Sequence, residues 1–145
     1  LAEQIEWTCR NIAYNLDFVP DDKLNWKVSE TADSPLGIAN HVARSIAGGL
    51  SNLRTGNWEI DGEPISSRDE IKEHIVKLGC EYAAELRKLP DSAFEGLKET
   101  PFGPMPNALI ISIPIYDAIH HHGQIAFLQT TWGDGEDHFF NAGSF

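Results

Sequence analysis

The feature that most constrains this chain is a long apolar segment, residues 106–132, with a cluster of polar side chains near its middle. Residues 116–124 read Tyr-Asp-Ala-Ile-His-His-His-Gly-Gln, and isoleucines and leucines flank them on both sides. Polar groups in such surroundings are expected to be buried, and their burial costs free energy unless they pair or bind something. The segment therefore predicts a polar site inside an apolar core, and a metal ion is one ligand that imidazole and carboxylate groups would bind.

Four segments have the apolar spacing of amphipathic helices. A serine N-cap followed by proline at 34–35 predicts the start of the second helix, and Gly56 its end. An S-x-x-E capping box at 67–70 predicts the start of the third. Pro114 lies inside the fourth helix and predicts a kink there. The expected helices span residues 1–18, 34–54, 67–88 and 106–132.

The segments between the helices are polar or rich in glycine and proline. Residues 21–33 and 57–66 predict connections, and residues 91–105 predict at most a short extended piece with a turn, since proline and glycine disfavour a long strand. Gly48 and Gly49 inside the second helix predict close packing of a neighbouring element.

These patterns predict an all-α fold: a four-helix bundle with long connections and a kinked fourth helix, forming a single domain over residues 1–145 with a tail at 133–145. Bundles of this kind hold metal and ligand sites between facing helices. Cys9 and Cys80 do not form a disulfide framework, so we expect free thiols in a reducing compartment.

The chain is acidic, with 22 Asp and Glu against 11 Lys and Arg and a formal net charge of −11. This balance argues against nucleic acid and anionic membranes as partners, because both need clustered cations. No stretch approaches the roughly 20 apolar residues of a membrane span. No signal peptide opens the chain, although Leu1 is not an initiator methionine, and a cytoplasmic location is the expectation.

On a helical wheel, the three imidazoles of the fourth helix point in different directions. Asp117, His121 and Gln124 share one face, His120 lies about 60° from Asp117 at its edge, and His122 is expected to point outward. An aspartate and a histidine four residues apart lie one above the other on a helix. Asp117 and His121 could therefore bind one ion, and zinc, nickel and iron all accept such ligands.

Two ligands do not close a metal site, so a third must come from another helix. The candidate is His41 at the edge of the second helix's apolar face, a position that permits an inward side chain without proving one. A hydrogen-bond network between histidine and glutamine would explain the polar cluster without a metal. His74 and His138 lie among charged residues and are expected to be exposed to solvent.

The chain resembles the DinB-like (YfiT-type) family of metal-dependent four-helix-bundle proteins over essentially its whole length. Residues 117–124 align without a gap to the family's fourth-helix pattern His-Asp/Glu-x-His-His-Arg-Gly-Gln. Residues 40–42, Asn-His-Val, match the family's second-helix phrase, and residues 24–26 and 34–37 resemble the entry into that helix. Asp117 departs from the pattern, since histidine is commoner there, and His122 replaces the usual arginine. Mycothiol-dependent maleylpyruvate isomerase, a related member, has an acidic residue at the place of Asp117.

The resemblance implies a divalent metal ion held by His41, Asp117 and His121, with open positions for water or substrate. His120 and Gln124 would support these ligands or line the cavity, and no catalytic residue is assigned. Some relatives are transferases or isomerases that act with a low-molecular-weight thiol such as mycothiol or bacillithiol.

Three functions follow from these patterns. The first is a metal-dependent enzyme of the thiol S-transferase or isomerase type, acting on an unknown small molecule. The second is a non-catalytic metal-binding, ligand-binding or interaction protein of the same fold, and the third is a polar cluster that only stabilises the fold. The resemblance also allows a homodimer. The aromatic tail, residues 138–140 and Phe145, could dock on the body of the protein or on a partner.

Overall fold

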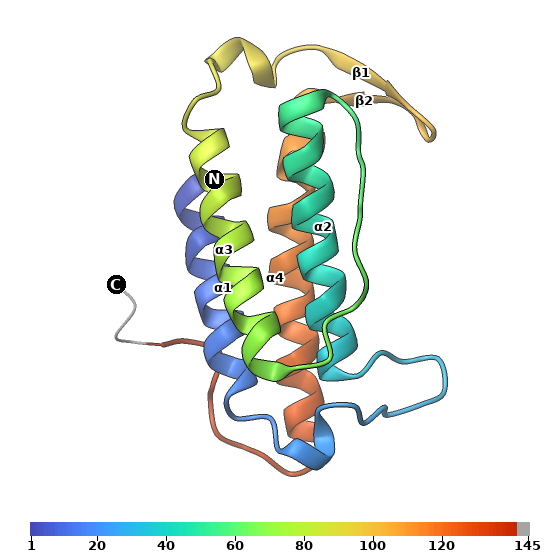
Figure 1. Cartoon of the computed structure of the whole chain (residues 1–145), viewed down its shortest axis with the longest axis vertical. Coiled ribbons are helices and arrows are strands. Elements are labelled where there is room, and N and C mark those ends of the chain that lie inside the picture. Colours follow the sequence, from blue (N-terminus) through green and yellow to red (C-terminus); the bar gives the residue numbers. More distant parts are fainter. Residues whose placement is uncertain (142–145) are drawn as a thin grey trace.

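Four long helices lie side by side in a computed structural model of the chain, in which residues 1–141 are described (Figure 1). α1 contacts α3 and α4, and α2 contacts the same two helices. α1 and α4 run in one direction along the bundle, while α2 and α3 run in the other (Figure 1). The predicted all-α four-helix bundle is confirmed. The helices are α1 Ala2–Leu16, α2 Pro35–Thr55, α3 Arg68–Leu86 and α4 Asn107–Thr131.

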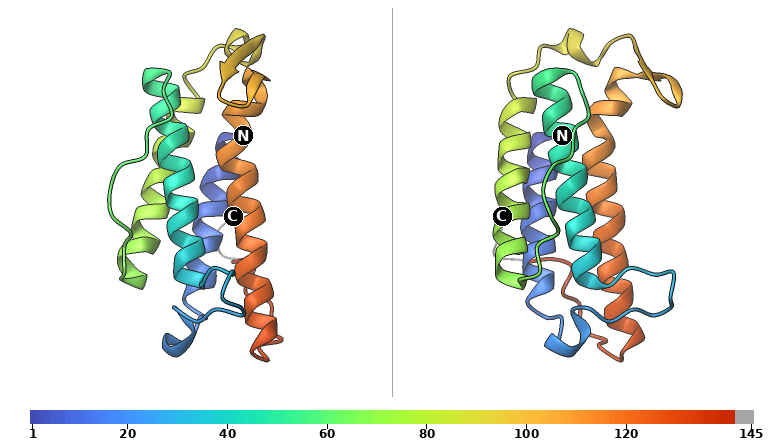
Figure 2. Two further views of the ribbon diagram at one scale, coloured as in Figure 1. Left: turned by 90° about the vertical axis from the view of Figure 1, so that its right-hand side faces the viewer. Right: turned by 45° about the vertical axis from the view of Figure 1, so that its right-hand side comes forward.

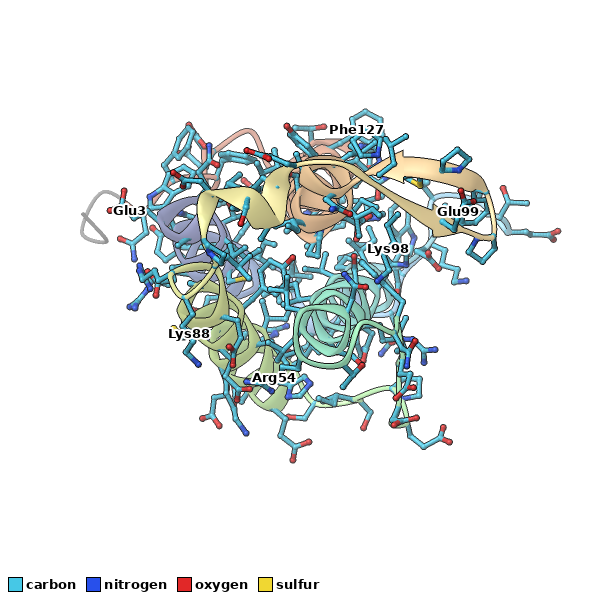
Figure 3. The ribbon with its side chains drawn as sticks, turned by 90° about the horizontal axis from the view of Figure 1, so that it is seen from above. Glu3, Arg54, Lys88, Lys98, Glu99 and Phe127 are labelled. Atoms are coloured by element: carbon cyan, nitrogen blue, oxygen red, sulfur yellow. The ribbon has the colours of Figure 1, made fainter. Side chains whose placement is uncertain are left out.

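The connections are long, as predicted. The segment between α2 and α3 passes alongside α2 over much of the length of the bundle (Figure 2). Between α3 and α4 the chain forms the 3₁₀ turn η2 (Asp91–Phe94) and an antiparallel hairpin of β1 (Leu97–Thr100) and β2 (Gly103–Pro106). Another 3₁₀ turn, η1 (Asp21–Lys23), lies between α1 and α2. Seen along the bundle, the hairpin projects beyond the helices (Figure 3).

The predicted helix starts are confirmed by their capping hydrogen bonds. Ser34 Oγ accepts a hydrogen bond from the Gly37 N–H at 3.1 Å, and Pro35 is the first residue of α2. Ser67 Oγ likewise accepts from the Glu70 N–H at the start of α3. Each such cap is worth about 1 kcal/mol, because it satisfies a backbone donor that has no partner inside the helix.

Gly48 and Gly49 allow close contacts on two sides of α2, which confirms the predicted close packing. A Cβ atom at Gly48 would lie 2.1 Å from the indole nitrogen of Trp58, which belongs to the connection after α2. A Cβ atom at Gly49 would lie 2.4 Å from Cγ of Pro114 on α4 and 3.1 Å from the ring of Tyr82 on α3. The missing side chain of Gly49 therefore brings α3 and α4 against α2.

α4 continues through Pro114, which has no N–H to donate to the carbonyl one turn earlier. Tyr82 of α3 is fully buried, and its hydroxyl donates a hydrogen bond of 2.8 Å to the carbonyl of Ile111 in this turn. Burial raises the pKa of the Tyr82 hydroxyl, which therefore stays a neutral donor. The predicted kink at Pro114 stays a prediction.

The tail after α4 docks on the body of the protein. The ring of His138 stacks on Phe18 with centroids 3.9 Å apart, and the ring of Phe139 stacks on His122 at the same distance. Phe140 packs against Trp7 of α1. Of the two alternatives for the tail, docking on the body is therefore the one found for residues 138–140, whereas the expectation for Phe145 lies outside the described residues.

Two expectations for histidines in this region were wrong. His122 was expected to point outward, but it is 1% exposed. The helical wheel assumed that α4 has one buried face. In the structure α4 packs against both α1 and α2, so it has two buried faces. His138 was expected to be exposed, but its side chain is 13% exposed and contacts Asp134 at 3.0 Å.

The outer face of α4 remains apolar and exposed. Phe127 is 63% exposed, and Figure 3 shows it on the outer side of the bundle. No helix within residues 1–141 is long and apolar enough to cross a membrane. An exposed apolar stripe is a common feature of protein interfaces, and the homodimer stays a prediction. The large apolar residues of this face are Leu109, Tyr116, Ile119 and Phe127.

We predict that Gly49→Ala lowers the free energy of unfolding by about 1–2 kcal/mol in urea denaturation. The new methyl group would clash with the rigid ring of Pro114, and overpacking of this kind outweighs the gain in helix propensity. Gly123→Ala is the matched control, because a Cβ at this exposed position of α4 meets no atom within 4 Å. That substitution should stabilise the protein by up to about 1 kcal/mol. Equal effects of the two substitutions would contradict this account of the α2–α4 contact.

We predict that His122 makes the protein less stable as the pH falls from about 6.5 to about 4. Burial lowers the pKa of His122 to about 4 from 6.5, so in this window the unfolded chain takes up a proton that the folded chain does not. The full effect is about 3 kcal/mol, since each pKa unit corresponds to about 1.4 kcal/mol. In His122→Phe this contribution disappears, and denaturation series from pH 7 to pH 4 should show a shallower loss of stability. Parallel curves for the two proteins would contradict the prediction.

Candidate metal centre

The candidate site lies between α2 and α4, which pack side by side and antiparallel (Figure 1). His41 is in the second turn of α2, and its side chain is 53% exposed. Asp117 and His121 are one turn apart on α4, with side chains 23% and 16% exposed. The structure thus brings together the three residues that the sequence proposed, at a position that solvent reaches from the side of His41.

The donor atoms of the three side chains converge. One ligand atom from each residue can be chosen so that all three lie within 4.8 Å of one another. Nε2 of His41 is 3.4 Å from Oδ2 of Asp117, and Nε2 of His121 is 3.3 Å from Oδ1 of the same carboxylate. Two ligands that bind a zinc ion at about 2.1 Å with tetrahedral angles are roughly 3.4 Å apart, so these separations suit a shared ion.

A hydrogen-bond network indicates the tautomer of His121. Its Nδ1 is 2.6 Å from Oε1 of Gln124, and Nε2 of the same amide is 3.1 Å from Nε2 of His120. An amide oxygen only accepts hydrogen bonds, so with the amide in this orientation Nδ1 of His121 is the donor. In the neutral imidazole, Nε2 of His121 then carries a lone pair directed into the site, which is the tautomer that a metal needs.

In this tautomer, Nε2 of neutral His121 offers no proton to the carboxylate of Asp117. Its Oδ2 is shielded from solvent, and no residue of the described chain donates a hydrogen bond to it. A lone pair of His121 and a carboxylate oxygen at 3.3 Å would repel each other unless a proton or a cation lies between them. The donor set of two imidazoles and one carboxylate therefore fits a divalent ion such as zinc.

His120 and Gln124 lie beside His121 on α4, and their supporting role at a metal stays a prediction. Gln124 joins the two neighbouring histidines of α4, so the alternative of a histidine–glutamine network is found together with the converging ligands. His120 is exposed on the outer side of the helix, contacts the amide of Gln124 and packs edge-on against the ring of His121 with centroids 4.9 Å apart. The expectation that His74 is exposed was wrong, since this residue of α3 is half-buried. It lies next to the connection from α2 to α3 and borders two cavities there.

A cavity of about 450 Å³ lies beside the site, with His41 in its wall. The side-chain amide of Asn40 holds one side of the cavity in place. Its nitrogen donates to the carbonyl of Ile65, and its oxygen accepts from the Ile65 N–H, both at 2.8 Å. This paired contact fixes the α2–α3 connection next to His41. The remaining wall residues include Asn25, Ser34, Arg44 and Ser66.

Sequence reasoning did not assign Arg44 or the role of Asn40. Arg44 follows His41 by three residues, so helix geometry alone places the two on neighbouring positions of one face. The contact between Asn40 and Ile65 spans 25 residues, and no local pattern signals it.

Comparison with known proteins supports the fold and goes no further. No family model and no curated protein matches the sequence. The crystal structure of a DinB-like protein, YjoA, from Bacillus subtilis matches with a TM-score of 0.74 and 14% identity, covering 93% of each chain. That of a DinB-like protein from Bacillus cereus matches with a TM-score of 0.68 and 22% identity, covering 88% of this chain and 87% of the other. The chain therefore has the fold of DinB-like proteins, and the resemblance seen in the sequence is confirmed at that level.

Proposed function

We propose that this protein binds a divalent metal ion through His41, Asp117 and His121 and uses it in the transfer or isomerisation of a small molecule by a low-molecular-weight thiol. The observation that carries the proposal is the convergence of two imidazole nitrogens on the carboxylate of Asp117, whose shielded oxygen Oδ2 receives no hydrogen bond from the described chain. Zinc, nickel and iron all suit these ligands. The resemblance to DinB-like proteins supplies the reaction class, which the geometry alone does not fix.

The architecture of the site is that of an open metal site. Three protein ligands leave at least one position for water or substrate, which is the pattern of catalytic zinc sites. The exposed side of His41 and the adjoining cavity give a small molecule access to that position. A bound divalent cation would lower the pKa of a thiol and so supply a thiolate at neutral pH.

The chain's own residues would position this chemistry. Gln124 orients His121 through a hydrogen bond with its Nδ1. The negative charge of the Asp117 carboxylate would attract a cation to the position between the imidazoles. In a transfer, the thiol proton passes to solvent, sulfur forms a bond to an electrophilic carbon, and the leaving group departs with its electron pair. A non-catalytic protein of the same fold would bind the metal and the thiol without accelerating this step.

We predict near-stoichiometric divalent metal in protein purified without a histidine tag. Elemental analysis should show that the metal is lost in His121→Ala, which removes a ligand. In Asp117→Ala the metal content should be lower than in the wild-type protein, because binding is weakened. His74→Ala is the matched control, because this histidine lies on α3 away from the three ligands and should leave the metal content unchanged. Unchanged metal content in both site variants would overturn the assignment.

We predict that the metal-loaded protein accelerates the reaction of a chloronitrobenzene with at least one thiol from a panel of cysteine, coenzyme A and other low-molecular-weight thiols. Acceleration should disappear in His121→Ala and persist in His74→Ala. Rates would be followed by the absorbance of the thioether product. If the loaded protein accelerates the reaction with none of these thiols, the non-catalytic binding function is favoured over the enzyme.

A further inference from the structure

We propose that Arg44 and the cavity beside His41 form a subsite for a carboxylate, so that the natural ligand of the metal centre carries a metal-binding group at one end and a carboxylate at the other. This inference rests on the proposed metal site and names the chemical class of its ligand. The proposal starts from the cavity of about 450 Å³, a volume that suits a small molecule, whose wall contains both His41 and Arg44.

Arg44 and His41 line the same cavity. Arg44 follows His41 by three residues on α2, and side chains at this spacing have Cβ atoms about 5–6 Å apart. A short molecule that is held at the metal centre and extends past His41 into the cavity would meet Arg44 in the cavity wall. Its path would pass along the wall that Asn40 and Ile65 hold in place.

The guanidinium of Arg44 is available for such a ligand. Within residues 1–141, Arg44 makes no ion pair or hydrogen bond with another residue, although the chain has twice as many acidic as basic residues. Three other arginines, on α2 or at the two ends of α3, behave differently. Arg54 pairs with Glu81 and Glu85, Arg68 with Asp21, and Arg87 with Glu6.

Arginine suits a carboxylate because its planar guanidinium can donate two parallel hydrogen bonds to the two oxygens. The overall charge of −11 would by itself disfavour an anionic ligand, so a preference for one needs a local cation. Asp61 and Glu63 line the next cavity, which Arg44 also borders, and their charges oppose that preference. They form no ion pair with Arg44 in the described chain and so leave its donors free for a ligand.

The experiment compares two thiols of equal length, mercaptopropionate and mercaptopropanol, which differ in the carboxylate. Both would be titrated into cobalt-loaded protein, and the sulfur-to-cobalt absorption band gives the dissociation constant of each. We expect mercaptopropionate to bind about three- to tenfold more tightly, the range for a partly exposed charge-assisted contact. In Arg44→Gln the ratio should fall to about one or below, and Asp61→Asn should raise it.

Arg10→Gln is the matched control, since it removes one exposed arginine from α1 and should keep the wild-type ratio. Equal affinity for the two thiols in the wild-type protein, or the same ratio in Arg44→Gln, would overturn the carboxylate subsite while leaving the metal-centred function standing. The absence of an absorption band with either thiol would contradict the proposed function itself, and the subsite with it.

Discussion

The contact between Gly49 and Pro114 is the constraint on which the candidate site depends. A proline ring lies where any side chain at position 49 would be, so α2 and α4 approach closely at this point. The two helices are antiparallel, and from this contact seven or eight residues, about 11 Å of helix, lead along each of them in the same direction to His41 and His121. Their imidazoles can meet the carboxylate of Asp117 because the spacing of the helices is set two turns away.

Three consecutive histidines on α4 have three different environments because the helix packs against two neighbours. His120 is exposed, His121 faces α2 and the site, and His122 is buried toward α1 and the docked tail. Each imidazole is suited to its place by what surrounds it. The amide of Gln124 orients His121, whereas burial keeps His122 neutral by lowering its pKa to about 4.

Few charged side chains lie near the candidate site, although the protein as a whole is acidic. Asp117 is the one Asp, Glu, Lys or Arg residue on the 25-residue helix α4, and it lies at the site. On α2, Arg44 lines the cavity beside His41 and has no ion-pair or hydrogen-bond partner among the described residues. The fold itself is shared with DinB-like proteins at 14% and 22% identity, so helix packing persists while most side chains differ. What this chain does must therefore be argued from its own site.

The sequence by itself determined the four helices, their caps at Ser34 and Ser67 and the close packing at the glycine pair, because these depend on local spacing and backbone chemistry. It also placed Asp117 and His121 on one helical face. Tertiary structure alone decided that His41 joins them, that His122 is buried, and that Asn40 fixes a distant loop beside the site. A helical wheel gives the direction of a side chain, whereas which helix lies in that direction depends on how all four pack together.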